Sequence, residues 1–240
     1  MLIYHTSDLH DHRGIAQPLQ ALRAAAPGLL LDCGDALRGS QTVYHRSEPI
    51  IAEMDAAKYD AQAAGNREFH YLFGAMAARA RQMHHPLICT NVVDIKARPL
   101  PFIDHLRLDY DGVRLYLTGL LIMQYPVGSP WERLFGWRFL DPDRVIEKHA
   151  ARVLDGELFV VLSHLGLSLD RKLAEHVPRI DLLLGGHSHD TLHEPQFVNG
   201  VPIVHAGPYG RYVSRSDLRR DSAAKRPRLH AFALLPLLPT

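Results

Sequence analysis

Polar side chains of the types that bind metal ions follow five short apolar runs of this sequence. The runs occupy residues 2–7, 29–34, 61–65, 159–163 and 181–186. The polar residues that they lead into are Asp8, His10, Asp35, Asn66, His164, His187 and His189. In open α/β sheets, ligands bind beyond the carboxyl ends of the strands. One polar residue after one strand means little, but five such cases in succession predict a single site.

The spacing within these motifs also has physical content. Asp8 and His10 are two residues apart in a segment that we expect to be extended, so their side chains should leave on the same side. His187 and His189 repeat this spacing after Gly185–Gly186, which would let the backbone bend close to the site. The sequence therefore predicts two pairs of neighbouring ligands.

The donor set combines carboxylates, one amide and imidazoles, with no cysteine. Such a set suits manganese, iron, cobalt or zinc better than an all-oxygen magnesium or calcium site. The donors exceed the need of one ion and suit two ions with a shared ligand, for which Asp35 is the candidate, while Asn66 adds a neutral oxygen. Two ions ~3.5–4 Å apart clamp the oxygens of a phosphoryl displacement and activate a bridging water, so we expect a metal-bridging hydroxide as the nucleophile.

A covalent mechanism has less support in the sequence. Ser163 precedes a histidine, but no Gly-x-Ser-x-Gly turn is present. The two cysteines, Cys33 and Cys89, lie in or beside apolar runs, and we expect both to be buried thiols of a reducing compartment. Cys33 is therefore interpreted as a packing residue.

Length and composition favour one globular domain over residues 1–240. The chain is 47% hydrophobic and 22% charged, with a formal net charge of +1. This balance provides no basic field for duplex nucleic acid and no polybasic membrane anchor. The first residues do not resemble a signal peptide, and no apolar run reaches the ~18 residues of a membrane span. We therefore expect a cytoplasmic protein; its oligomeric state is not predicted.

Apolar runs alternate with helical patterns, which favours an α/β fold. Residues 105–121 read as a hairpin that turns at Asp111–Gly112. A helix is expected over 141–154 with Asp141 as its cap, and another over 47–59 with Ser47 as its cap. Further helices are expected over 15–28, over 168–177 and in a segment that carries Phe69, Phe73, Met76 and Met83.

The order of the motifs resembles that of the calcineurin-like metallophosphoesterases, a superfamily of two-metal phosphohydrolases. The motifs read D-x-H, G-D, G-N, S-H and G-H-x-H along the chain. Residues 162–189 and 201–218 are similar to segments of the catalytic domain of bacterial 5′-nucleotidases. The resemblance extends from residue 1 to about residue 219.

This resemblance implies a fold, an activity and a ligand set. The fold is a four-layer α-β-β-α sandwich of two mixed sheets, with the site at the carboxyl ends of the strands. The activity is hydrolysis of a phosphate ester of a small molecule such as a nucleotide. The two metal sites share Asp35 and consist of Asp8, His10, Asp35 and His189 for one ion, and Asp35, Asn66, His164 and His187 for the other.

The chain departs from the nucleotidase pattern in two respects. The nucleotidases typically read G-N-H-E-F-D, whereas Arg67 and His70 stand at the histidine and aspartate positions here. We also expect no counterpart of their C-terminal nucleotide-binding domain. The predicted catalytic residues are thus Asn66, Arg67 and His70, with His70 as the only nearby substitute for the missing acid.

Arg67 favours an alternative activity on the same scaffold. Arginine holds its protons above pH ~12 and cannot protonate a leaving group, but it can clamp phosphate oxygens. The Gly-Asn-Arg motif resembles that of phosphoesterases that split the pyrophosphate bond of UDP-diacylglucosamine. A phosphodiesterase or pyrophosphohydrolase is therefore the alternative to a nucleotidase. A non-catalytic scaffold protein is the more remote alternative, because the charged ligands of a complete metal site would repel one another without a metal ion.

Other residues near the motifs allow more than one interpretation. His12 could touch solvent or substrate, and Tyr209 is expected to be a turn and packing residue. Trp131 and Trp137 lie in a Pro/Gly-rich segment, where they could stack on a base or cover the core.

Overall fold

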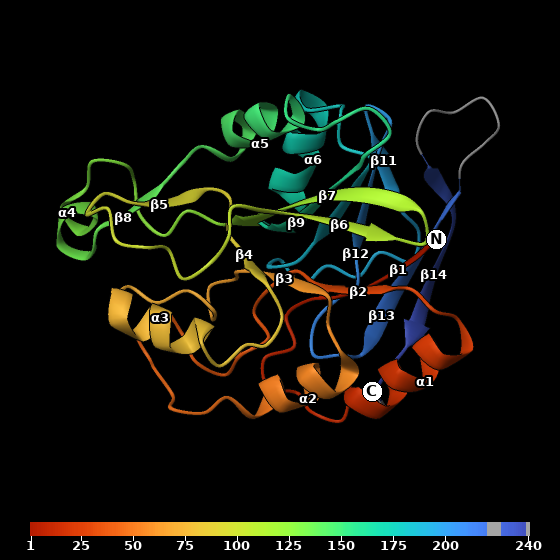
Figure 1. Cartoon of the computed structure of the whole chain (residues 1–240), viewed down its shortest axis with the longest axis horizontal. Coiled ribbons are helices and arrows are strands. Elements are labelled where there is room, and N and C mark those ends of the chain that lie inside the picture. The colour runs from red at the N-terminus through yellow and green to blue at the C-terminus, as the bar shows by residue number, and fades with distance from the viewer. Residues whose placement is uncertain (220–226, 239–240) are drawn as a thin grey trace.

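Two six-stranded mixed sheets form the centre of the molecule in the computed structural model, which describes residues 1–219 and 227–238 (Figure 1). The first sheet has the order β14-β13-β1-β2-β3-β4. Its strands span, in that order, Arg228–Pro236, Tyr212–Arg219, Leu2–Thr6, Leu29–Asp32, Ala61–Ala63 and Leu87–Ile88. Strands β1 to β4 are parallel, and β13 and β14 extend the sheet in antiparallel fashion.

The second sheet has the order β11-β12-β10-β9-β7-β6. Its strands span, in that order, Gln196–Val198, Val201–His205, Leu182–Gly185, Leu158–His164, Val113–Leu121 and His105–Tyr110. The four central strands are parallel, and the two edge strands are antiparallel to their neighbours. Both sheets therefore bring the carboxyl ends of several neighbouring strands to one edge.

Three apolar interfaces hold the layers together. Strand β9 illustrates the pattern, because its buried residues alternate between two clusters: Val160 and Leu162 pack between the sheets, whereas Phe159 and Val161 pack toward helices. A third cluster lies between the first sheet and its own helices and includes Leu30. Each sheet is thus buried on both faces.

Helices cover the outer face of each sheet. Figure 1 shows α1 (Ala16–Ala25), α2 (Pro49–Ala57) and α3 (Phe73–Ala80) on one side of the sheets, and α5 (Pro142–Ala150) and α6 (Leu167–His176) on the other. The predicted four-layer α-β-β-α architecture is confirmed. A small extension at one end consists of β5 (Val92–Asp94), α4 (Pro130–Phe135) and β8 (Trp137–Phe139) (Figure 1). No helix among the described residues combines the length and apolar character needed to cross a membrane.

Two local predictions are confirmed in detail. Strands β6 and β7 form the expected hairpin, with Asp111 and Gly112 both at positive φ, as a tight turn of the I′ kind requires. Helix α5 begins as expected, because the Asp141 carboxylate accepts a hydrogen bond from the backbone of Arg144 at 3.0 Å.

Two helix starts are wrong in the sequence prediction. Glu48, not Ser47, occupies the N-cap position of α2, and its carboxylate accepts a hydrogen bond from the backbone of Arg38 instead of capping the helix. Helix α3 spans Phe73–Ala80, so both Phe69 and Met83 lie outside it. Residues 65–69 form a turn in which the Phe69 backbone N–H donates to the Gly65 carbonyl, and the apolar spacing alone did not reveal this break.

Candidate functional site

The predicted metal ligands converge where the carboxyl ends of the two sheets meet. Strands β1, β2 and β3 are neighbours in the first sheet, and β9 and β10 are neighbours in the second. The sheets are joined at this edge, because His164 Nδ1 lies 2.7 Å from the Cys33 carbonyl oxygen. The backbone N–H of His187 lies 3.0 Å and 3.1 Å from the two carboxylate oxygens of Asp8. Residues more than 150 positions apart in sequence therefore form one site.

Five of the predicted ligands have left-handed backbone conformations, which residues other than glycine rarely adopt. They are Asp8, His10, Asp35, His187 and His189, with φ between 49° and 75°. The expectation that Asp8 and His10 lie in an extended segment is therefore wrong, because the chain turns at these residues. Such strain costs of order 1–3 kcal/mol per residue and is concentrated at functional sites, which fits a role in binding.

The strained turn after β1 is held by backbone hydrogen bonds to the neighbouring loop. The N–H groups of Asp8 and His10 donate to the carbonyls of Gly34 and Asp35, both at 2.9 Å. The sequence showed the residue types but not this ladder, which joins two loops more than 20 positions apart.

Among the described residues, two groups of side chains have donor atoms close enough to hold a metal ion. The open group is Asp8, His10 and His189, and the buried group is Asp8, Asp35 and His164; within each, the donor atoms lie within 4.8 Å of one another. Asp8 belongs to both groups. The resemblance assigned the shared position to Asp35, whose Oδ1 lies 3.4 Å from His164 Nε2.

His187 lies beside the buried group, whereas the described side-chain contact of Asn66 is with Gln124 and not with a predicted metal ligand. The His187 ring contacts the His164 ring, with their centroids 5.0 Å apart. The Asn66 side-chain oxygen accepts a hydrogen bond from Gln124 at 3.1 Å. Gln124 comes from the loop after β7, and no motif in the sequence pointed to it.

The geometry of His164 fits a bound cation. Its Nδ1 donates to a carbonyl, which leaves Nε2 as an acceptor directed at Asp35 Oδ1. Nε2 is buried and has no hydrogen-bond partner among the described residues. Two facing acceptors repel one another unless a cation or a proton lies between them. The nitrogen and oxygen donors present, without a thiolate, are of the kind that divalent transition ions bind.

Without a metal ion, a proton takes the place of that cation. Burial lowers the pKa of His164, but the charges of Asp35 and Asp8 outweigh it and raise the pKa to about 9. Burial raises the pKa of Asp35, but the facing His164 outweighs it and lowers the pKa to about 2. In the open group, burial and the charge of Arg67 lower the pKa of His10 to about 4. In the metal-free protein, the histidine of the buried group therefore holds its proton to a much higher pH than His10 of the open group does.

A buried glutamate organises the loops that carry two of the ligands. The Glu68 carboxylate accepts hydrogen bonds from the backbone N–H groups of Asp35 at 2.6 Å, Gly65 at 2.8 Å and Ala36 at 2.9 Å. These bonds tie the loop after β2 to the loop after β3. The sequence contained Glu68 in the motif but no sign of its partners.

Arg67 lies between the two candidate groups. Its backbone N–H donates to Asp35 Oδ1 at 2.7 Å, and its charge depresses the pKa of His10 after the larger effect of burial. Its guanidinium is oriented by carbonyl oxygens of the loop after β2, with Nη1 3.1 Å from the Arg38 oxygen. The buried guanidinium of Arg79, on α3, donates to the carbonyls of Arg67 at 2.6 Å and Val43 at 2.8 Å and so supports both loops.

His70 lies beneath the same loop. It is 4% exposed, and its Nδ1 accepts a hydrogen bond from the backbone of Leu72 at 3.0 Å. Burial and the charge of Arg79 lower its pKa. None of its described contacts is with a predicted metal ligand, so the structure does not bring it together with them. Its catalytic role stays a prediction.

A buried polar chain supports the second sheet behind His164. Asp170, on α6, accepts a hydrogen bond from the Ser163 hydroxyl at 2.5 Å and lies 2.7 Å from His205 Nε2. The Cys33 thiol is also buried and donates to the Leu184 carbonyl, in agreement with its interpretation as a packing residue. Ser163 thus links strand β9 to helix α6 through its hydrogen bond to Asp170, which is a structural role and not that of a nucleophile.

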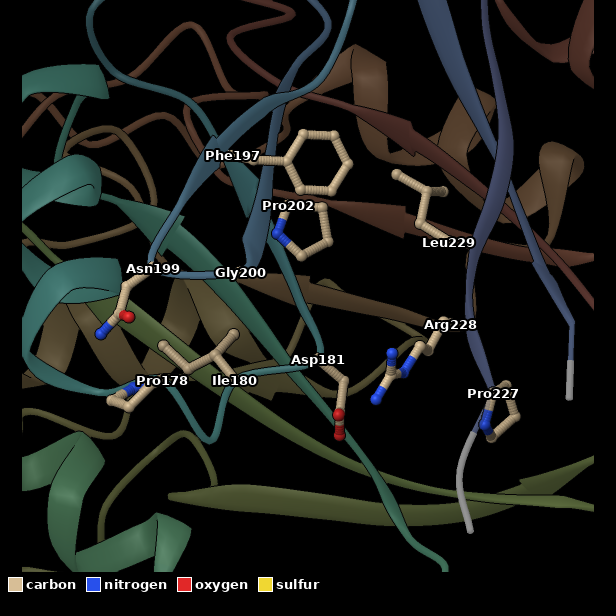
Figure 2. A pocket seen from close by; sticks show the side chains of 10 residues that line it. All are labelled: Pro178, Ile180, Asp181, Phe197, Asn199, Gly200, Pro202, Pro227, Arg228 and Leu229. Carbon is tan, nitrogen blue, oxygen red and sulfur yellow. The ribbon is translucent and has the colours of Figure 1, made fainter. Parts of the chain in front are cut away.

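A pocket of about 370 Å³ lies at the opposite end of the parallel strands (Figure 2). Figure 2 shows Asp181 and Arg228 on one side and Phe197 and Pro202 on the other. Asp181 precedes β10, whereas the predicted ligands His187 and His189 follow it. This pocket is therefore separate from the candidate metal site.

The chain is similar in sequence to known metallophosphoesterases and 5′-nucleotidases, although no family model matches it. It is 30% identical to the uncharacterized metallophosphoesterase YunD of Bacillus subtilis over an alignment of 240 residues. This alignment covers 93% of this chain and 51% of YunD. It is 26% identical over 223 residues to a 5′-nucleotidase of Vibrio cholerae, which covers 79% of this chain and 40% of that protein. The chain thus spans about half the length of these relatives, or less.

Solved structures show the same fold. The 5′-nucleotidase precursor from Thermus thermophilus superimposes with a TM-score of 0.80 at 25% identity, over 99% of this chain and 54% of that chain. The calcineurin-like phosphoesterase YfkN from Bacillus subtilis gives a TM-score of 0.74 at 20% identity, over 99% of this chain and 90% of that chain. The predicted resemblance is confirmed: the homologues are metallophosphoesterases and 5′-nucleotidases, which are phosphoric ester hydrolases.

Proposed function

We propose that this relative of the metallophosphoesterases and 5′-nucleotidases hydrolyses a phosphate ester or anhydride of a small molecule with two divalent metal ions. The observation that carries the proposal is the convergence of two candidate metal-binding groups on a shared aspartate, Asp8, at the carboxyl ends of both sheets. The left-handed backbone of five predicted ligands supports it, because strain of this kind persists where function requires it.

The chain's own residues have distinct parts in this proposal. Asp8, His10, Asp35, Asn66, His164, His187 and His189 hold the two ions, for which manganese, iron, zinc and cobalt are the candidates. When bound, the ions supply Lewis-acid activation of water and of the phosphoryl oxygens. The loops that position these donors are fixed by Glu68 and Arg79, so the side chains are placed before substrate arrives.

Arg67 is proposed to bind the phosphoryl group. Its side-chain hydrogen bonds among the described residues all use Nη1, so the N–H groups of Nε and Nη2 are left for phosphate oxygens. Two parallel donors of this kind bind phosphate in bidentate fashion and stabilise negative charge in the transition state. Arginine does not supply a proton, so the leaving group must depart without strong protonation.

This property favours a second candidate function on the same scaffold. A pyrophosphohydrolase, or a phosphodiesterase that acts on a diester with a low-pKa leaving oxygen, suits Arg67 better than an enzyme that must release the alkoxide of a ribose 5′-monophosphate. His70 is the remaining proposed acid, although it is buried and bonded to the backbone of Leu72.

Two measurements test the proposal. Metal analysis of the purified protein should find up to two transition ions per chain. A manganese-supplemented panel of nucleoside monophosphates, cyclic nucleotides, nucleotide sugars and an aryl phosphodiester should show hydrolysis of at least one class. Far less than one ion per chain after manganese loading, with no hydrolysis, would instead support a scaffold function.

A further inference from the structure

Tyr209 has an unusual backbone for a large side chain. Its φ is 67°, in the left-handed region, in the turn between β12 and β13, where Gly207 and Gly210 also have positive φ. Glycine or asparagine adopts this conformation more readily than tyrosine does. The turn is fixed at the metal site, because the Tyr209 N–H donates to the Asp8 carbonyl at 2.8 Å. A strained backbone here therefore places an aromatic ring beside the site.

The ring lies against the open group. Its centroid is 5.6 Å from that of His10, 5.5 Å from that of His189 and 4.7 Å from that of His12. The His12 ring is itself held in place, since its Nδ1 lies 3.0 Å from the Leu9 carbonyl oxygen. Tyr209 thus borders the open group, and His12 packs against the Tyr209 ring; we call these two residues the aromatic wall.

The aromatic wall is accessible from solvent. Tyr209 is half-buried and His12 is exposed, and the Arg211 guanidinium lies 5.6 Å from the tyrosine ring. The other aromatic candidates lie elsewhere: Trp137 is fully buried and donates to the Tyr71 carbonyl, and Trp131 stacks on Phe135 within α4. Tyr209, predicted as a turn and packing residue, contacts the rings of His10 and His189, whereas neither tryptophan has a ring contact with a predicted metal ligand among the described residues.

We propose that Tyr209, with His12, binds the planar aromatic group of the substrate, a nucleobase or an aryl ring, while its phosphoryl group occupies the metal site. This inference depends on the proposed function and narrows its substrate class to phosphates that carry an aromatic group. A flat ring on a tyrosine face gains apolar burial and stacking, and any base can provide that face.

The test compares ligands that differ only in the base. Manganese-loaded wild type, Tyr209→Leu and Tyr209→Phe are titrated with the non-hydrolysable phosphonate analogues of adenosine 5′-monophosphate and ribose 5-phosphate. Wild type and Tyr209→Phe should bind the adenosine analogue roughly tenfold more tightly, as one stacked base provides. Tyr209→Leu should bring the two affinities to within about twofold, because leucine offers no ring.

Two controls separate recognition from structure. Phe197→Leu removes a ring that is 62% exposed at the pocket of Figure 2, far from the ligands, and should leave the ratio unchanged. Metal content of Tyr209→Leu should equal that of wild type. A loss of metal in Tyr209→Leu would overturn the proposal in favour of a role in holding His10 and His189.

The remaining outcomes distinguish this inference from the proposed function. A wild type that binds both analogues equally, or a Tyr209→Leu variant that keeps the tenfold preference, would overturn the aromatic wall even if the protein is an active phosphohydrolase. Tenfold discrimination that depends on Tyr209, with no hydrolysis of any phosphate in the panel, would support the aromatic wall and refute the proposed function.

Discussion

The open group and the buried group share Asp8 but differ in their contact with solvent. The His189 side chain is 38% exposed, whereas those of Asp8 and His164 are fully buried. The buried group faces the interior where the two sheets meet, and its histidine is oriented by a carbonyl of the opposite sheet. The open group is bordered by the aromatic wall. We therefore expect an ion in the buried group to be held tightly, and an ion in the open group to exchange more readily with solvent.

The largest effect should come from removing the ligand that the two ions share. If that ligand is Asp35, as the resemblance implies, Asp35→Asn should lower activity by roughly 10²–10³-fold and deplete both ions, because one charge then serves two cations. The structure places Asp8 in both groups, so Asp8→Asn is the matched comparison. Metal content and turnover of the two variants decide between them.

Each outcome of that comparison has a clear meaning. An Asp35→Asn protein that binds two ions and turns over normally would show that Asp35 is not the bridge. If Asp8→Asn alone loses both ions, the shared ligand is Asp8, as the geometry of the two groups indicates.

The pH dependence of metal binding should also differ between the groups. In the metal-free protein the pKa of His164 is raised to about 9, so below that pH an ion must displace its proton. Affinity at the buried group should therefore fall about tenfold per pH unit as the pH drops below 9. The pKa of His10 is lowered to about 4, so this residue should release no proton at neutral pH.

Calorimetry in buffers of different ionisation enthalpy measures these protons directly. Near pH 7, one binding step should release about one proton from His164, and His164→Ala should abolish this release. Proton release that is unchanged in His164→Ala would contradict this assignment of the raised pKa.

The pairing of His164 with Asp35 also predicts how the stability of the metal-free protein depends on pH. A histidine whose pKa rises on folding stabilises the fold at pH values below its ordinary pKa of ~6.5, and this contribution disappears as the pH rises through about 9. The melting temperature of the metal-free protein should therefore fall over that interval. Loading with manganese should remove most of the fall, since the cation then replaces the proton. An equal fall with and without metal would argue against the pairing.

A smaller loss is expected when only the open group is changed. His189→Ala should weaken one ion by at least the 10–100-fold that loss of even an outer-shell partner costs, and leave the other bound. The expected result is one retained ion per chain by metal analysis. Loss of both ions would mean that the groups bind cooperatively, and the contrast between them would not hold.

The sequence predicted which residues follow the strands far better than it predicted the backbone conformation of those residues. Asp8 and His10 were recognised by type and spacing, but their left-handed backbone depends on hydrogen bonds to the loop after β2, which no local pattern reveals. The supports provided by Glu68 and Arg79 were missed for the same reason, since both act through backbone groups distant in sequence.

Tyr209 illustrates the other limit of the sequence. Its setting between glycines indicated a turn, which is correct, because Gly207 and Gly210 have positive φ. The ring contacts with His10 and His189 exist only because the turn is anchored to Asp8 by a backbone hydrogen bond. A residue interpreted as turn packing therefore became the candidate for substrate contact only in three dimensions.

The smallest effect should appear at Arg67, which lies between the two groups: its backbone donates to Asp35 and its charge reaches His10. An imidazole at this position can protonate a departing alkoxide, whereas a guanidinium cannot. Arg67→His should therefore gain about tenfold on a ribose 5′-monophosphate relative to an aryl phosphodiester, less than an optimally placed acid provides. Arg67→Lys is the control, because it keeps a cation without adding an acid of suitable pKa, and it should not gain on the monophosphate. A wild type that prefers nucleoside monophosphates, with a ratio unchanged in Arg67→His, would show that the residue does not set the leaving group.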